Sequence, residues 1–258
     1  MEPDRYSVSI SDDASTVVVG EPGYDGDRGR VCVYDIAVSL DESSWNRRGD
    51  CLAGLATGDQ FGYSVSNLYG QVVAVGAPYG VHMTMRTGYV AVYIWDPDDR
   101  GWTLLGEVIN GFADDQLAGQ SVDINDGIGL VVIVGAPGYN SNAGTWFCME
   151  YDDATSKWSP RGESLLVGAA GDQLGKSVSI RTLGRGSATI VAIGAPQSID
   201  AGNGYVQTFA FSWDEDGEGS WMQLGSNFNG IQSSDYAGYA VSLSGGLPVF
   251  LFSTFVVV

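Results

Sequence analysis

The apolar positions of the chain fall in short runs that are rich in β-branched and aromatic side chains and are separated by Gly, Asp, Asn and Pro. Residues 63–66, 72–75, 89–94 and 102–109 form one such series. Runs of this kind between turn-forming residues are typical of β-strands. No segment carries a sustained helical period with a cap at both ends. The pattern therefore predicts an all-β chain with four strands in each series.

The same series of strands recurs about every 57 residues along the chain. A Ser-Val-Ser-like strand comes first, and an apolar run ending in a Gly-Ala-Pro-like sequence follows it. The glycines of that sequence stand 56, 59 and 59 residues apart, at Gly20, Gly76, Gly135 and Gly194. One four-stranded sheet cannot bury both of its faces, so neighbouring sheets must stack on each other. The repeat predicts a β-propeller of four-stranded antiparallel blades.

We expect residues 1–258 to form a single propeller domain. Four full repeats and a partial fifth cover about 4–58, 59–114, 115–171, 172–234 and 235–258. Because both ends supply first strands of a repeat, the propeller is expected to be incomplete or open, and the chain is interpreted as a fragment. Open blade edges favour pairing with another chain, so self-association is expected as well. The apolar tail 247–258 is shorter than the roughly 20 residues that span a bilayer, and no membrane insertion is predicted.

The pairing of Phe61-Gly62 with Gly76-Ala77-Pro78 resembles the FG-GAP repeat of integrin α-chain propellers. The resemblance covers nearly the whole chain, from Tyr6 to about Ser244, and it implies the propeller fold. By the same resemblance, one face of the propeller would bind a protein ligand, and the protein would act outside the cell or at its surface. The start of the chain shows no signal peptide, so the sequence leaves the compartment unknown.

The chain is strongly acidic, and this narrows the choice of partners. It has 12 basic and 31 acidic residues and a net charge of −19. Nucleic acid is therefore not expected as a partner, nor is an anionic membrane. Acids gather in turns such as 96–99 and 214–216, where solvated loops explain them.

The three cysteines are Cys32, Cys51 and Cys148. An odd number cannot be fully paired within one chain, and no spacing typical of zinc or redox sites is present. Cys32 lies in a predicted third strand, where a buried free thiol is expected.

Several sequence motifs are interpreted as structural. Arg48-Gly49-Asp50 falls on a repeat position and is expected in a fourth strand and its exit turn. Recurring acids before the Phe-Gly position are expected to hold backbone amides in turns, and the apolar residues beside them to pack between sheets. The acids are Asp59, Asp115, Asp172 and Asp235, and the apolar residues are Phe61, Leu117 and Leu174.

Neither a metal site nor a catalytic centre is predicted. The loops between first and second strands lack enough correctly spaced acids for calcium. His82 is the only histidine, which excludes histidine triads within the chain. We therefore predict no cofactor, no metal and no catalytic residue, although acids distant in sequence could still converge as a glycosidase pair.

The loops between second and third strands differ in every repeat, at 23–28, 79–87, 138–143 and 197–203. In a propeller they share one face with the connections between blades, so this face is the predicted binding surface. Its predicted ligand-binding residues are Tyr24, Tyr79, His82, Tyr139, Asn140 and Asp200.

The leading hypothesis is a non-catalytic, adhesion-type binding module that recognises a protein ligand. The alternatives are a lectin-like propeller whose tyrosines stack on sugar rings, and a propeller hydrolase with convergent acids.

Overall fold

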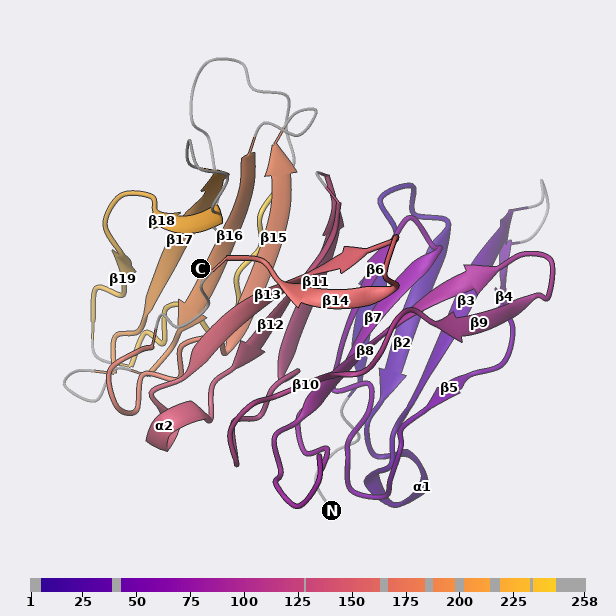
Figure 1. Cartoon of the computed structure of the whole chain (residues 1–258), viewed down its shortest axis with the longest axis horizontal. Coiled ribbons are helices and arrows are strands. Elements are labelled where there is room, and N and C mark those ends of the chain that lie inside the picture. The colour runs from indigo at the N-terminus through magenta and orange to yellow at the C-terminus, as the bar shows by residue number, and fades with distance from the viewer. Residues whose placement is uncertain are drawn as a thin grey trace. The chain divides into compact units, whose positions relative to one another are not determined.

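The computed structural model describes residues 6–38, 43–127, 129–162, 167–183, 188–197, 202–213, 219–232 and 234–244. The described part is all-β, and each full repeat supplies one antiparallel sheet of consecutive strands (Figure 1). By contact the chain divides into two compact units, Met1–Gly119 and Gln120–Val258. The predicted fold class, a β-propeller of four-stranded antiparallel blades, is confirmed.

The first unit holds two sheets. The first contains β1 (Ser7–Ile10), β2 (Thr16–Glu21), β3 (Arg30–Val38), β4 (Ser43–Arg47) and the short β5 (Leu52–Ala53), which pairs with β3. The second contains β6 (Ser64–Leu68), β7 (Val72–Ala77), β8 (Tyr89–Asp96), β9 (Gly101–Leu104) and β10 (Ile109–Asn110). Both β9 and β10 pair with β8, so the strand predicted over 102–109 is two short strands. Gly106 lies between them at φ +72°, a left-handed conformation that interrupts the strand.

The second unit also holds two sheets. The first contains β11 (Ser121–Asp126), β12 (Leu130–Ala136), β13 (Thr145–Asp152) and β14 (Lys157–Pro160). The second contains β15 (Ser177–Leu183), β16 (Ala188–Ala195), β17 (Tyr205–Trp213), β18 (Gly219–Gln223) and β19 (Phe228–Asn229). The helical turns α1 (Tyr24–Asp27) and α2 (Tyr139–Asn142) follow the second strand of their repeats. Within the described residues, no helix is long and apolar enough to cross a membrane.

In each unit the core lies between its two sheets. In the first, Val33 and Phe61 pack with Val75, and in the second, Ile133 and Trp146 pack with Ile193. Each of these six residues has at most 1% of its surface exposed. Stacking of sheets therefore buries the apolar faces, as the repeat predicted.

A serine and two glycines form the same junction in every repeat. The first-strand serine donates its hydroxyl to the carbonyl of the glycine that opens the next repeat. The four bonds are Ser7 to Gly62 (2.7 Å), Ser64 to Gly119 (2.8 Å), Ser121 to Gly175 (2.8 Å) and Ser177 to Gly238 (2.8 Å). A Cβ on the glycine of the Gly-Ala-Pro element would overlap that same carbonyl. The recurrence of Ser and Gly is therefore a requirement of this junction.

A carboxylate holds the turn before the junction glycine. Asp59 accepts a hydrogen bond from the backbone N–H of Ala56 at 2.8 Å, and Asp172 accepts one from Ala169 at 3.0 Å. Asp235 accepts two such bonds, at 2.8 and 2.7 Å. The predicted structural role of these three acids is confirmed.

In the third repeat this role belongs to Gln116, so the assignment to Asp115 was wrong. The amide oxygen of Gln116 accepts bonds from the N–H groups of Phe112 and Ala113 at 2.8 and 3.0 Å. Asp115 instead forms an ion pair with Arg86 at 2.5 Å. The residue that holds the turn stands three positions before the junction glycine, and in the third repeat this residue is Gln116. Its amide oxygen can accept backbone hydrogen bonds as a carboxylate oxygen does.

The apolar residue packed at this junction is likewise shifted by one position. Phe61 and Leu174 are buried as predicted, with 1% of their surface exposed. In the third repeat the buried residue is Ala118, whereas Leu117 is partly exposed at φ +59°.

The expectation of a free thiol at Cys32 was wrong, because Cys32 and Cys51 form a disulfide. Val31 of β3 pairs with Leu52 of β5, so antiparallel pairing places Cys51 opposite Cys32, with their Cα atoms 4.4 Å apart. Cys148 is the free, buried cysteine, and burial raises the pKa of its thiol.

Candidate functional site

An open pocket of about 1240 Å³ lies on the fourth sheet and the segment that follows it. We call it the aromatic pocket. It is lined by Gln173, Lys176, Pro196, Gln197, Phe228, Asn229, Gly230, Ile231, Asp235, Tyr236, Ala237, Tyr239 and Ala240. All of these residues belong to the second unit.

Loops held by the repeated junction position this lining. Gln173 and Lys176 precede β15, and Pro196 and Gln197 follow β16. The remaining lining residues form β19 or follow it. The N–H of Gln197 donates to the carbonyl of Asp172 at 3.2 Å, which ties two of these loops together. The N–H of Ala237 donates to the carbonyl of Asn203 at 2.9 Å. The pocket is therefore built on the face that carries the connections after the second and fourth strands.

Three exposed aromatic rings dominate the chemistry of the pocket. The exposed fractions are 50% for Phe228, 45% for Tyr236 and 67% for Tyr239. The ammonium group of Lys176 lies 5.9 Å from the ring centroid of Tyr239 and donates to the side chain of Gln120 at 2.9 Å. Apolar rings beside amide and ammonium groups suit a ligand with both apolar faces and hydroxyl groups.

Asp235 is the one acid among the described lining residues of the aromatic pocket. Its carboxylate binds the N–H groups of Ile231 and Gln232. Nearby, the hydroxyl of Tyr205 donates to the carboxylate of Asp172 at 2.8 Å. The pKa of Tyr205 is raised mainly by burial and further by this carboxylate. Among the residues that the structure describes, no group of three or more His, Cys, Asp or Glu could hold a metal ion.

The predicted site residues Tyr24, Tyr139 and Asn140 lie in matching loops of the two units. Tyr24 begins α1, and the guanidinium of Arg30 lies 4.0 Å from the centroid of its ring. Tyr139 begins α2, and the exposed Asn140 has φ +48°, which asparagine tolerates.

Tyr79 and His82 lie together in the loop between β7 and β8. Tyr79 makes an edge contact with Tyr63, with ring centroids 6.4 Å apart. His82 pairs with Met85 through backbone hydrogen bonds of 2.9 and 3.1 Å. Asp200 lies outside the described residues. Which of the predicted residues bind a ligand stays a prediction.

Gln197, which occupies the same position in the fourth repeat as Tyr79 in the second, lines the aromatic pocket. Both residues directly follow the proline of the Gly-Ala-Pro element. Phe228, Tyr236 and Tyr239 were not among the predicted ligand-binding residues. A departure from the repeat could have revealed one of them, because Tyr236 stands where the second and fourth repeats have Gln60 and Gln173.

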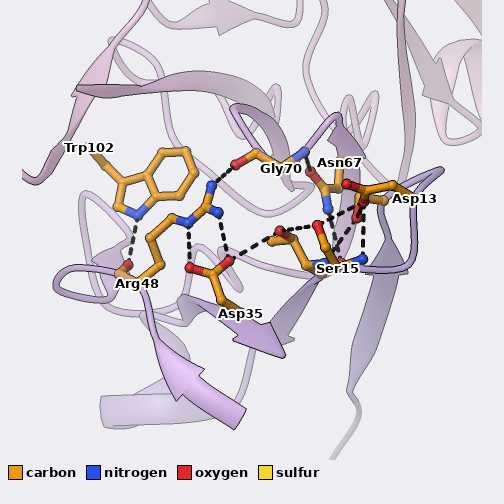
Figure 2. Close-up of polar contacts among 9 residues, drawn as sticks. Asp13, Ser15, Asp35, Arg48, Asn67, Gly70 and Trp102 are labelled. Atoms are coloured by element: carbon orange, nitrogen blue, oxygen red, sulfur yellow. Dashed lines mark hydrogen bonds and ion pairs between the residues drawn. The ribbon is translucent and has the colours of Figure 1, made fainter. Parts of the chain in front are cut away.

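Arg48 of the Arg-Gly-Asp sequence is held within the first unit, as Figure 2 shows. Its guanidinium makes a two-pronged contact with Asp35, at 2.7 and 2.8 Å, and also binds the carbonyl of Gly70. Its own carbonyl accepts the indole N–H of Trp102 at 3.1 Å. Arg48 therefore serves structure, as predicted, while the neighbouring Asp50 is fully exposed.

The same figure shows a polar loop between β1 and β2. The hydroxyl of Ser11 donates to Asp13 at 2.6 Å, and the N–H and hydroxyl of Ser15 donate to the same oxygen at 3.0 and 2.8 Å. These bonds, led by that of Ser11, lower the pKa of Asp13 to about 2.

No protein-family model and no curated protein sequence matches the chain. Solved structures of similar fold include an α-L-arabinanase of Penicillium chrysogenum complexed with arabinobiose. The TM-score is 0.54 at 12% identity, over 95% of this chain and 73% of that one. At this identity the likeness shows the fold alone, and the fold is a propeller.

Two further solved structures are similar at a TM-score of 0.47, too low to carry an argument. One is the Dos1 propeller, at 11% identity over 93% of this chain and 64% of that one, so this chain spans less than two thirds of its length. The other is a xylan β-1,4-xylosidase of Bacillus halodurans C-125, at 14% identity over 84% of this chain and 42% of that one.

The arabinanase corrects the expectation of a non-catalytic, adhesion-type module. A propeller of similar fold is an enzyme complexed with a sugar. The expectation that this chain is not an enzyme therefore no longer holds.

Proposed function

We propose that the chain is a carbohydrate-active propeller that binds a glycan in the aromatic pocket and hydrolyses its glycosidic bonds. The observation that carries the proposal is the cluster of three exposed rings in one open pocket. Sugar rings present apolar faces and polar rims, which aromatic and amide side chains together can match. The similar propeller complexed with arabinobiose supports an arabinose-type glycan as the first to be tried.

The pocket also offers hydrogen-bonding groups beside the rings. The amides of Gln173, Gln197 and Asn229 line it, and each can both donate and accept. Hydroxyl groups of a sugar need both kinds of partner, so this lining suits a neutral glycan chain.

Hydrolysis requires two carboxyl groups on either side of the scissile bond. The described lining supplies Asp235, whose carboxylate already holds the turn before Ala237 in the way that Asp59 and Asp172 hold theirs. We therefore assign the pocket as the glycan site and assign no catalytic pair within it.

A titration with arabino- and xylo-oligosaccharides tests the binding step. Replacing Tyr236 and Tyr239 together by Ala should weaken the affinity at least about tenfold, since each tenfold change corresponds to about 1.4 kcal/mol and buried aromatic contacts often exceed 1 kcal/mol. The matched control is Tyr69→Ala, because Tyr69 is 57% exposed, belongs to the first unit and does not line the pocket.

Equal binding by the double variant and the wild type would refute the assignment of the aromatic pocket. Tight binding without release of shorter sugars would contradict the hydrolase part of the proposal and leave the binding surface in place.

We also propose that the repeat is a diverged form of the FG-GAP repeat. The junction supports this view, because the N–H of Gly62 donates to the carbonyl of Gly76 at 3.0 Å, joining the Phe-Gly and Gly-Ala-Pro elements of one repeat. Gly175 and Gly194 make the same bond at 3.0 Å. Structures of undisputed FG-GAP propellers that lack this bond would count against the relationship.

A further inference from the structure

A second pocket, of about 720 Å³, gathers arginines in a chain that is otherwise strongly acidic. It lies in the first unit, and we call it the arginine pocket. It is lined by Asp35, Asn46, Arg47, Arg48, Gly49, Trp95, Pro97 and Arg100. Three of the chain's 12 basic residues therefore face one hollow.

The fold brings these side chains together from two neighbouring sheets. Arg47 ends β4, and Arg48 and Gly49 follow it in the turn. Trp95 lies near the end of β8, and Arg100 directly precedes β9. A Cβ on Gly49 would lie 2.8 Å from the ring of Trp95, so only glycine lets the turn approach the indole this closely. The disulfide at Cys51 anchors the other end of the turn.

The three arginines of the pocket differ in how far nearby carboxylates neutralise their charge. Arg48 is neutralised by Asp35, as Figure 2 shows. Arg47 is 54% exposed in its side chain; its Nε donates to the carbonyl of Gly49 at 3.1 Å, and its Nη2 lies 3.7 Å from the fully exposed Asp50. Arg100 is exposed, and its side chain forms no hydrogen bond or ion pair with the residues that the structure describes. Two guanidinium groups therefore retain donors for an outside anion.

Carboxylates near the pocket compete weakly for these donors. Asp96 accepts the N–H groups of Asp98 and Asp99 at 2.9 and 3.3 Å, which fixes its side chain on its own turn. Neither Asp96, Asp98 nor Asp99 lines the pocket. The acidic turn thus surrounds Arg100 without occupying its binding groups.

We propose that the arginine pocket binds the carboxylate of an acidic sugar, a uronate residue of a glycan. Arginine matches a carboxylate with two parallel hydrogen bonds, a geometry already seen between Arg48 and Asp35. Trp95 offers an indole surface on which the sugar ring can lie, and Asn46 offers an amide for its hydroxyl groups. The site stands independently of the aromatic pocket, because each lies in a different unit.

Calorimetric titration with tri-galacturonate tests the proposal. Arg47→Gln combined with Arg100→Gln should reduce the affinity at least tenfold and leave the melting temperature unchanged, because both side chains are exposed. Arg48 is left intact, since its loss would strand Asp35. Lys157→Gln is the control, because it removes one positive charge from an exposed residue of the other unit.

Three outcomes would overturn the proposal. They are unchanged tri-galacturonate binding in the double variant, equal weakening in the Lys157→Gln control, and binding of inorganic sulfate as tight as that of tri-galacturonate. The last result would identify a general anion site instead of a sugar site. Replacement of Tyr236 and Tyr239 should leave this binding intact, which separates it from the function proposed for the aromatic pocket.

Discussion

Replacing Gly76 by Ala should destabilise the first unit through the junction between β7 and the segment that ends at Gly119. An added Cβ would overlap the carbonyl oxygen of Gly119 and the hydroxyl of Ser64, and would lie 2.8 Å from the carbonyl carbon of Gly119. Relief of the overlap requires β7 and the Gly119 segment to separate locally, which also breaks the 2.8 Å hydrogen bond from Ser64 to Gly119.

The magnitude follows from these two contributions. Overpacking in a well-packed core costs about 1–3 kcal/mol, and one lost hydrogen bond adds about 1 kcal/mol, so we expect a loss of about 2–4 kcal/mol in the free energy of unfolding. Such a loss is a large part of the about 5–15 kcal/mol by which most domains are stable. Gly194→Ala should behave alike in the second unit, because it meets the same junction at Gly238 and Ser177.

Gly101→Ala is the matched control. A Cβ there would meet nothing closer than 4.0 Å, and its φ is not positive. The substitution should be neutral or stabilise by up to about 1 kcal/mol, since it lowers the entropy of the unfolded chain. Urea unfolding followed by tryptophan fluorescence compares the variants. A midpoint for Gly76→Ala equal to that of Gly101→Ala would refute the junction as described.

Two further predictions concern the disulfide and the tyrosines Tyr89 and Tyr205. Replacing Cys32 and Cys51 by Ser should lower the free energy of unfolding by about 3 kcal/mol, as expected for a closed loop of this size; unchanged urea midpoints for the variant and for the reduced wild type would contradict this. Burial raises the pKa of Tyr89 and Tyr205 above the ordinary value of 10.0, so the folded state holds their protons longer than the unfolded state. The stability that their neutral form contributes should be fully present below about pH 10 and lost as the pH rises further, which urea midpoints between about pH 8 and pH 11 would reveal. A flatter pH dependence is expected when both tyrosines are replaced by Phe, and an identical slope would count against the assignment.

Much of the fold could be predicted because its signals are local. Strands begin at residues such as Ser64 and Tyr89, and glycines mark each junction. These residues recur since every blade needs the same hydrogen bond and the same close approach. A repeated pattern in one chain therefore carried enough information to predict the four-stranded antiparallel sheets and the structural role of Arg48.

The features that escaped prediction depend on contacts between distant residues. The pairing of Cys32 with Cys51 needs β5 to turn back onto β3, and a two-residue strand gives almost no periodic signal. The role of Gln116 was not predicted, because the other repeats have an aspartate at this position. An amide oxygen can accept the same backbone hydrogen bonds as a carboxylate oxygen. The aromatic pocket escaped because Phe228 and Tyr239 meet only through the folded loops.

The most direct measurement is the release of sugars from arabinan and xylan by the wild type and by the variant with Tyr236 and Tyr239 replaced by Ala. We predict that the wild type shortens one of these glycans and that the double variant loses at least about nine tenths of the rate, in line with a tenfold loss of binding. Absence of any release by the folded wild type, or an equal rate in the double variant, would contradict a carbohydrate-active site in the aromatic pocket.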